Sequence, residues 1–256
     1  MRTLHLTDLH AHLGYHDLHG SEPACVYLHG LGTASSADFP TIARHPALVA
    51  YRALLVDLLG FGFSGRPAAF SYSLEAHAET VARLIEHLGL RGCHLVGHSF
   101  GGSVAVVLAA NRPDLIGGLI VAESNLDLED ATLSRMIADQ TEEAYVAAGH
   151  TALVAQAEGW AIQDTVMASF PGTLRAADPQ AMHRSATALA AGSLRELFFG
   201  LTLPRTYLFG ASTLPHAHEA LLRASGVPMV VIPDAGHAMM GENPDAVARA
   251  VAATLA

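Results

Sequence analysis

Short apolar runs alternate with longer amphipathic stretches along most of the chain. The runs are short, continuously apolar and often β-branched, which is typical of strands buried on both faces of a parallel sheet. They lie at Cys25–Leu28, Ala53–Val56, His94–Val96, Leu119–Ala122, Thr206–Phe209 and Met229–Ile232. The pattern therefore predicts a mostly parallel sheet.

Between these runs, apolar residues recur with helical spacing. The stretch Leu74–Leu88 carries an apolar stripe and ends at Gly89, a typical C-terminal helix cap. The stretch Gly102–Asn111 is small and apolar throughout, which predicts a buried helix, and Glu242–Leu255 predicts a last helix. Strands that alternate with helices indicate an α/β fold with right-handed crossovers.

Two regions interrupt this alternation. Residues 1–22 place several leucines near two glycines, which predicts an antiparallel hairpin at the sheet edge. Residues 127–200 contain no convincing strand and predict helices at 128–148, 152–169 and 179–192. We therefore expect a core formed by residues 1–126 and 201–256, with residues 127–200 inserted as a helical cap.

Composition narrows the class of protein. The 256 residues are 51% hydrophobic and 15% charged, which suits a single α/β domain with a large core. The net charge of -10 disfavours nucleic-acid binding, which requires a basic face. No apolar run approaches the roughly 18–20 residues that span a bilayer, and residues 1–15 lack the pattern of a secretion signal, so we expect a cytoplasmic protein. Cys25 and Cys93 are expected to be buried thiols.

The motif Gly97-His98-Ser99-Phe100-Gly101-Gly102 carries the clearest chemical signal. It joins a predicted strand to a predicted helix, and a nucleophile on such a turn holds a strained backbone that only small neighbours tolerate. Ser99 is therefore the predicted nucleophile. The Phe100 backbone N–H is a predicted oxyanion donor, whereas the His98 side chain is expected to point away from the substrate.

Two further segments complete the predicted site. His29-Gly30-Leu31-Gly32 follows an earlier strand, and the Leu31 N–H is the second predicted oxyanion donor. Asp234-Ala235-Gly236-His237 precedes the last helix. In a catalytic triad that begins with a serine on this type of turn, the histidine base comes last in chain order. The chain has 16 histidines, but only His237 occupies that position.

The order of these motifs resembles the α/β-hydrolase superfamily, in particular its serine-nucleophile members with a helical cap and the acid after the sixth strand. The segment Asp57–Ser64 is similar to the family's Asp-x-x-Gly-x-Gly-x-Ser turn, which is structural. The resemblance implies an α/β-hydrolase fold, with a mostly parallel central sheet flanked by helices and an inserted cap. The resemblance is fairly specific for the reaction mechanism, but it says little about the substrate.

The acid of the triad departs from the family's most frequent pattern. That pattern places Gly-x-x-Asp after the strand at 206–209, but this chain has Gly210-Ala211-Ser212-Thr213. Other members place the acid at the end of the preceding strand, where this chain has Glu123. We predict Glu123 as the acid, with Asp127 as the fallback and an acid-free dyad as a further possibility. Thr213 receives no role, and its replacement by alanine is expected to have a small effect.

These residues predict acyl transfer to water through Ser99 and His237, without a metal or organic cofactor. Apolar residues of the predicted cap and of the last loop fit a small acyl or aryl ester, although each could simply pack cap against core: Met136, Trp160, Met167, Phe170, Phe198, Phe199, Met239 and Met240. Hydrolysis of a lactone, a thioester or a carbon–carbon bond remains open, as do a non-hydrolytic lyase and a ligand-binding protein. The expected partner is a small-molecule substrate, and the sequence does not predict an oligomeric state.

Overall fold

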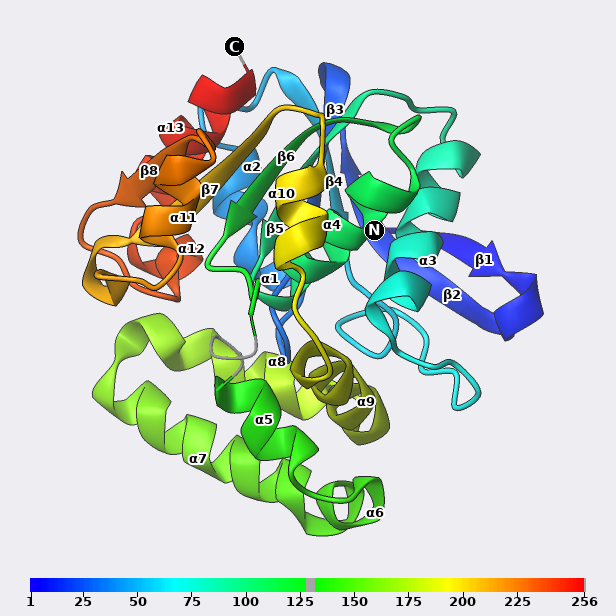
Figure 1. Cartoon of the computed structure of the whole chain (residues 1–256). Helices are drawn as coiled ribbons and strands as arrows, with labels where there is room; N and C mark the ends of the chain where they lie inside the picture. The colour runs from blue at the N-terminus through cyan, green and yellow to red at the C-terminus, as the bar shows by residue number, and fades with distance from the viewer. Residues whose placement is uncertain (128–131, 256) are drawn as a thin grey trace.

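The computed structural model describes residues 1–127 and 132–255. They form a central eight-stranded sheet with helices around it (Figure 1). The strand order is β1-β2-β4-β3-β5-β6-β7-β8. Strands β3 to β8 run parallel, whereas β2 runs antiparallel to both β1 and β4. The strands are β1 Arg2–Leu6, β2 Ala11–Leu18, β3 Ser21–Leu28, β4 Tyr51–Val56, β5 Cys93–His98, β6 Ile116–Ala122, β7 Arg205–Gly210 and β8 Met229–Ile232.

This sheet confirms the predicted fold class. Every apolar run that predicted a strand lies within one of the parallel strands β3 to β8. The N-terminal hairpin is also present, with Leu4 opposite Leu13 in the β1–β2 register. Both leucines are buried, so the hairpin extends the apolar face of the sheet at its edge.

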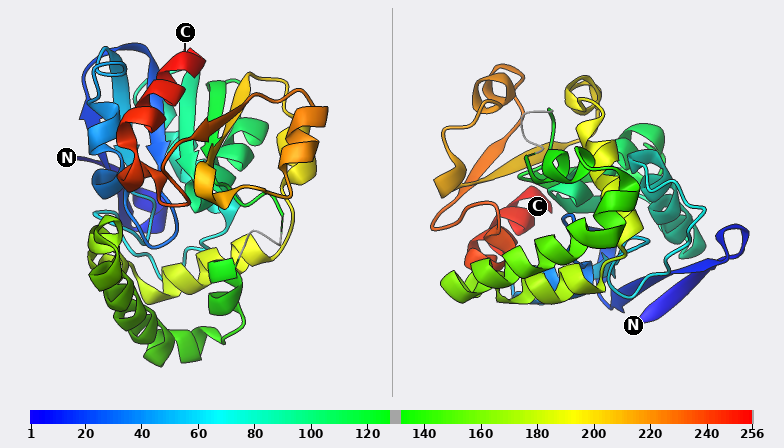
Figure 2. Two further views of the ribbon diagram at one scale, coloured as in Figure 1. Left: turned by 90° about the vertical axis from the view of Figure 1, so that its left-hand side faces the viewer. Right: turned by 90° about the horizontal axis from the view of Figure 1, so that it is seen from below.

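Helices cover both faces of the sheet and create two apolar cores (Figures 1 and 2). Helices α3 (Leu74–His87) and α4 (Phe100–Asn111) pack on one face, and α2 (Pro40–Ala43) and α13 (Pro244–Leu255) pack on the other. The short helices of the same layers are α1 Ser35–Asp38, α10 Arg195–Gly200, α11 Glu219–Ala224 and α12 Met239–Glu242. Cys25 and Cys93 are free and buried, as expected.

Further helices gather at one end of the sheet (Figures 1 and 2). They are α5 Thr132–Ala138, α6 Glu142–Ala144, a π-helical turn Tyr145–Gly149, α7 His150–Gln163, a 3-10 turn Thr165–Ser169, α8 Phe170–Ala176 and α9 Pro179–Ala190. The single helix predicted over 128–148 is divided, because Thr141 caps a new helix start. Residues 128–131 of that prediction lie outside the described residues. Helix α10, which the sequence assigned to the cap, packs on α4 in the sheet domain.

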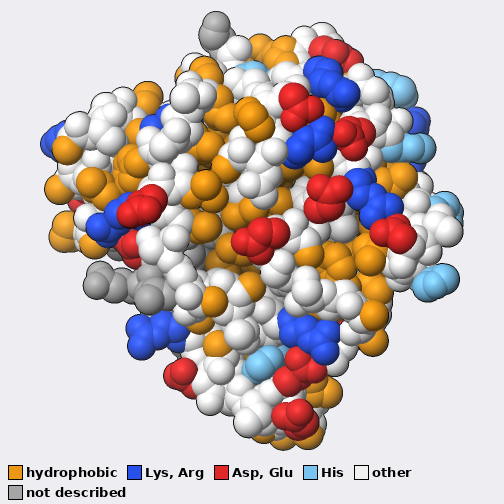
Figure 3. Space-filling model, turned by 45° about the vertical axis from the view of Figure 1, so that its right-hand side comes forward, with side chains coloured by type: hydrophobic (Ala, Val, Ile, Leu, Met, Phe, Trp, Pro, Cys, Tyr) orange, Lys and Arg blue, Asp and Glu red, His pale blue; other side chains and the backbone are white. Residues whose placement is uncertain are grey.

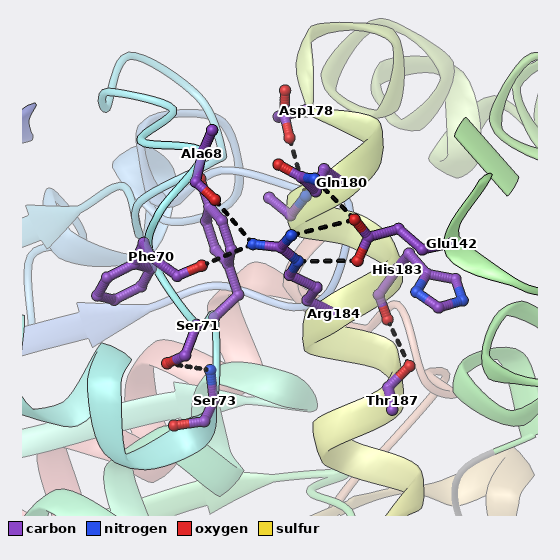
Figure 4. Close-up of polar contacts among 12 residues, drawn as sticks. Ala68, Phe70, Ser71, Ser73, Glu142, Asp178, Gln180, His183, Arg184 and Thr187 are labelled. Carbon is purple, nitrogen blue, oxygen red and sulfur yellow. Dashed lines mark hydrogen bonds and ion pairs between the residues drawn. The ribbon is translucent and has the colours of Figure 1, made fainter. Parts of the chain in front are cut away.

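An arginine on α9 connects this group of helices to a loop of the sheet domain (Figure 4). Arg184 forms a paired interaction with the Glu142 carboxylate, at 2.8 and 3.1 Å. Its remaining terminal nitrogen donates to the carbonyl oxygens of Ala68 and Phe70, at 2.9 and 3.0 Å. A planar guanidinium can satisfy all these acceptors at once, so Arg184 fixes α6, α9 and the loop together.

The start of α9 also approaches the sheet domain closely. Asp178 caps the helix by accepting from the Ala181 amide at 2.8 Å, while its own amide donates to the Gly60 carbonyl at 2.8 Å. Gly60 has a φ of +88°, and a Cβ atom there would lie 2.2 Å from the Ala181 Cβ. Glycine at position 60 therefore allows the two backbones to meet.

Charged side chains on the surface are interspersed rather than segregated. Figure 3 shows a face on which basic side chains lie beside acidic ones, separated by apolar and uncharged residues. Ion pairs such as Arg83–Asp8 and Arg112–Glu86, at 2.7 and 2.6 Å, illustrate this arrangement. In the part of the chain that the structure describes, no helix is both long enough and apolar enough to cross a bilayer.

Candidate active site

Ser99 occupies a strained turn between β5 and α4. Its φ and ψ are 50° and -119°, a conformation that residues other than glycine rarely adopt. A Cβ atom on Gly97 would lie 2.6 Å from the Gly101 carbonyl oxygen, and one on Gly101 would lie 2.2 Å from the Leu28 carbonyl oxygen. Both contacts are with backbone that cannot swing aside, so the turn requires glycine on each side of Ser99.

Two backbone N–H groups are the predicted oxyanion donors of this site. Helix α4 begins at Phe100, so the Phe100 N–H belongs to the first turn, which has no acceptor within the helix. The partial positive charge of the helix N-terminus favours an oxyanion at the same place. Leu31 follows β3 and lines the same cavity as Ser99. Phe100 follows Ser99 directly and Leu31 shares its cavity, and the role of their N–H groups as oxyanion donors stays a prediction.

His29 supports the loop that carries Leu31. The Leu58 amide donates to His29 Nε2 at 3.0 Å, so the ring's proton is on Nδ1 and is donated to the Gly30 carbonyl at 2.8 Å. Burial lowers the pKa of His29, which keeps the ring neutral and able to accept that bond. The histidine of the His-Gly motif thus connects the loop after β3 to the loop after β4.

The Asp57–Ser64 turn also has a supporting role. The Asp57 carboxylate accepts from the backbone and hydroxyl of Ser36, each at 2.9 Å, and from the Phe63 amide at 3.0 Å. These bonds hold the turn after β4 against helix α1. The structure therefore agrees with the structural interpretation of this motif.

His237 and Glu123 meet at the carboxyl ends of the strands. His237 Nδ1 lies 3.7 Å from Glu123 Oε2, with the imidazole 59% exposed and the carboxylate only 6% exposed. Glu123 follows β6 directly and has a φ of 48°. Asp127 has other partners: it accepts from Ser193 Oγ at 2.7 Å and pairs with Arg195. The geometry therefore favours Glu123 over Asp127 as the partner of the imidazole.

Thr213 is a residue of this site that the sequence did not reveal. Its hydroxyl donates to Glu123 Oε1 at 2.6 Å, and the Gly210 amide donates to the same oxygen at 2.8 Å. Thr213 stands where most relatives of this type are expected to carry the acid. Its position in the motif was the available signal. A hydroxyl at the usual place of the acid can hydrogen-bond to an acid that follows the neighbouring strand, and no such role was predicted for Thr213 from the sequence.

The environment of Glu123 favours its ionised form. Burial alone would raise the pKa of this carboxyl group, but its interactions with His237, Thr213 and the Gly210 amide outweigh burial and lower the pKa below its usual value. The carboxylate is therefore charged at neutral pH. A charged, buried acceptor at this place can stabilise an imidazolium on His237.

The prediction that His98 points away from the site is wrong. His98 Nε2 donates to the His237 backbone carbonyl at 2.7 Å, and the two ring centroids are 4.9 Å apart. The loop that carries His237 crosses the end of β5, so the last side chain of that strand lines the cavity. Burial lowers the pKa of His98 to about 3, so this ring is neutral and serves as a hydrogen-bond donor.

The cavity above Ser99 has a volume of about 580 Å³, within the range of small-molecule sites. The Trp160 and Phe170 rings stack there with centroids 6.4 Å apart and an interplanar angle of 14°. Of the apolar residues expected at the substrate, Trp160, Met167, Phe170 and Met240 line the cavity. Phe198 instead packs on Tyr207 in the sheet domain, and Met136 is exposed.

Comparison with known proteins identifies the family of the fold. A family model described as alpha/beta hydrolase fold matches residues 23–153, half of the chain. The sn-1-specific diacylglycerol lipase of Mus musculus is 40% identical over 116 residues, which are 43% of this chain and 36% of that protein. The matched part thus spans less than half the length of the curated relatives.

Solved structures match over nearly the whole chain. A thermophilic esterase from Thermogutta terrifontis is 26% identical, with a TM-score of 0.78 over 96% of this chain and 93% of that chain. An enol-lactonase from Burkholderia xenovorans LB400 has a TM-score of 0.80 over 99% of each chain. At 22% identity, the second likeness shows the fold alone.

Proposed function

The chain belongs to the alpha/beta hydrolase family, and we propose that within this family the protein is a serine hydrolase that cleaves small esters with an apolar acyl or aryl group. One observation carries the proposal: Ser99 is held at a φ of 50° at the start of α4, in a cavity that it shares with His237. Backbone strain of this kind is found mostly at functional sites, so the conformation of Ser99 argues against an ordinary tight turn that happens to contain a serine.

The reaction follows from the arrangement of the side chains. His237 removes the proton of the Ser99 hydroxyl as its oxygen attacks the ester carbonyl, and Glu123 stabilises the imidazolium that forms. The Leu31 and Phe100 N–H groups hold the oxyanion of the tetrahedral intermediate. His237 then protonates the departing alcohol, which leaves an acyl group on Ser99.

Water completes the cycle. His237 removes a proton from the incoming water, whose oxygen attacks the acyl carbon. As the second tetrahedral intermediate collapses, His237 returns that proton to the Ser99 oxygen, which releases the acid and restores the free enzyme. The 3.7 Å separation between His237 Nδ1 and Glu123 Oε2 is longer than a hydrogen bond. We expect it to shorten when substrate is bound, as catalytic hydrogen bonds commonly do.

An ester is the proposed substrate for two reasons. The cavity wall combines the stacked rings of Trp160 and Phe170 with the methionines 167 and 240, which suits an apolar group. The relative from Thermogutta terrifontis is an esterase and the mouse relative is a lipase, and both names denote ester hydrolysis. We also propose that the helices α5 to α9, within the expected cap segment 127–200, act as a cap, because some of their residues line the cavity above Ser99, whereas α10 packs on α4.

Hydrolysis of p-nitrophenyl esters of increasing acyl length tests this function. We expect wild-type turnover that Ser99→Ala reduces to the rate of the uncatalysed reaction, whereas Ser71→Ala, on an exposed loop, retains it. A fluorophosphonate should label the wild type at Ser99, as seen by mass spectrometry. Equal turnover by wild type and Ser99→Ala would refute a serine nucleophile.

A further inference from the structure

A carboxyl group that the reaction does not use lines the same cavity. Asp38 is the last residue of the short helix α1, which follows the loop that carries Leu31. Its side chain is part of the cavity wall together with the hydroxyls of Thr33 and Thr41. Thr33 donates its hydroxyl proton to the Gly30 carbonyl at 3.0 Å, and its hydroxyl also interacts with the Asp38 carboxyl group. This part of the cavity wall thus combines a carboxyl group with two hydroxyl-bearing residues.

No basic side chain balances this carboxyl among the described residues that line the cavity. All 14 basic residues of the chain are arginines, and the titratable cavity residues other than Asp38 are His98 and His237. Burial raises the pKa of Asp38 to about 6, opposed by Thr33 and assisted by the negative charge of Asp57. At neutral pH the group is therefore mostly an anion, which the Thr33 hydroxyl compensates in part and which has no basic side chain beside it among the described residues of the cavity wall.

The remainder of the cavity is apolar and aromatic. Leu133, Trp160, Val166 and Phe170 contribute to its wall. A ligand with an apolar body can bury that body against these side chains, and aromatic faces also attract cations. A carboxylate on the ligand would instead lose its hydration and meet the charge of Asp38 without a basic partner.

We propose that Asp38 is a substrate-binding residue that selects esters carrying a protonated amine on their apolar body and rejects esters carrying a carboxylate. This inference rests on the proposed function, because it assigns the cavity to an ester substrate. The ammonium group would donate to the Asp38 carboxylate as a charge-assisted hydrogen bond. The same interaction would neutralise the buried anion, so ligand binding would remove an unfavourable charge from the free enzyme.

Binding can be measured without catalysis, because the chain has a single tryptophan, Trp160, and it lines the cavity. We would titrate the protein at pH 7.5 with hexylammonium, hexan-1-ol and hexanoate, and follow tryptophan fluorescence. These probes share a six-carbon body and differ in charge. In the wild type we expect hexylammonium to bind most tightly and hexanoate most weakly.

The variant Asp38→Asn keeps the shape of the side chain and removes its charge. We expect it to weaken hexylammonium binding by about 10-fold to 100-fold, as for a hydrogen bond to a charged group. Asp139→Asn is the matched control, because it changes the net charge equally at an exposed position outside the cavity. Thermal unfolding of both variants checks that they are folded.

Two binding results would overturn the inference, and turnover provides a third test. One is hexanoate binding to the wild type at least as tightly as hexylammonium, which does not depend on any variant. The other is equal affinity of Asp38→Asn and Asp139→Asn for hexylammonium. Turnover of p-nitrophenyl hexanoate and p-nitrophenyl 6-aminohexanoate separates the two proposals: correct binding order without turnover refutes the esterase, whereas turnover with no preference for the amine refutes the role of Asp38.

Discussion

The hydroxyl of Thr213 should matter for catalysis, although within the described part of the chain it forms no hydrogen bond to Ser99 or His237. It donates to Glu123 Oε1 at 2.6 Å, and the Gly210 amide donates to the same oxygen at 2.8 Å. Thr213→Val removes the hydroxyl and keeps the branched shape of the side chain. A hydrogen bond to a charged group contributes about 1.5–3 kcal/mol, so we expect kcat/KM to fall by roughly 10-fold to 100-fold.

The pH profile gives this prediction a second readout. Thr213 helps to lower the pKa of Glu123, so its loss should raise that pKa and move the acid limb of the kcat/KM profile to higher pH. The same sign applies to stability. A carboxyl group whose pKa is lowered by folding stabilises the protein above its unfolded pKa, and this contribution is lost as the pH falls through the folded pKa. Thr213→Val should reduce that contribution.

Steady-state ester hydrolysis between pH 4 and pH 8 measures both the fall in kcat/KM and the shift of its acid limb. Thr213→Ser is the matched control, because it retains the hydroxyl and should remain close to the wild type. The double variant with Glu123→Gln tests the route, since a residue that acts through Glu123 has no further effect once the charge is gone. The reasoning fails if Thr213→Val and Thr213→Ser behave alike, or if the valine variant loses as much activity in the glutamine background.

Two other predictions follow from the site. Glu123→Gln should lower kcat by about 10³-fold to 10⁴-fold, because the carboxylate that orients the catalytic histidine is lost. Asp127→Asn should have a much smaller effect on ester hydrolysis. The reverse ranking of the two variants would assign the acid to Asp127. Gly101→Ala should destabilise the fold by more than about 3 kcal/mol in urea unfolding, because its Cβ would lie 2.2 Å from the Leu28 carbonyl oxygen. Gly159→Ala within α7 meets nothing within 4 Å and should stabilise by up to about 1 kcal/mol, so equal effects of the two substitutions would contradict the steric argument.

Local sequence patterns were sufficient for most of the fold. The parallel strands and the helices α3 and α4 follow from periodicity alone, because burial on both faces or along one stripe leaves a regular pattern. Helix boundaries were less accurate where a polar side chain ends or starts a helix. Thr141 divides the helix expected over 128–148, and Asp164 caps a separate 3-10 turn after α7.

In the candidate site too, some features could be predicted from the sequence and others could not. Motif order was enough to select Ser99 and His237, and the position of Glu123 at the end of a strand places it at the same edge of the sheet. The contacts of His98 and Thr213 were not predictable, because they depend on the paths of loops. His98 reaches a carbonyl 139 residues later, and Thr213 reaches a carboxylate 90 residues earlier.

The contact between Thr213 and Glu123 constrains how such an acid could move between strands during evolution. The two side chains touch, so an intermediate with carboxylates at both positions would place two like charges about a hydrogen bond apart, and one of them would have to bind a proton. Such an ancestor would keep a carboxylic acid and a carboxylate that share one proton beside the histidine. A lineage that first placed a neutral hydroxyl at position 213 would avoid this repulsion, but it would pass through an enzyme whose histidine has no carboxylate partner at either position.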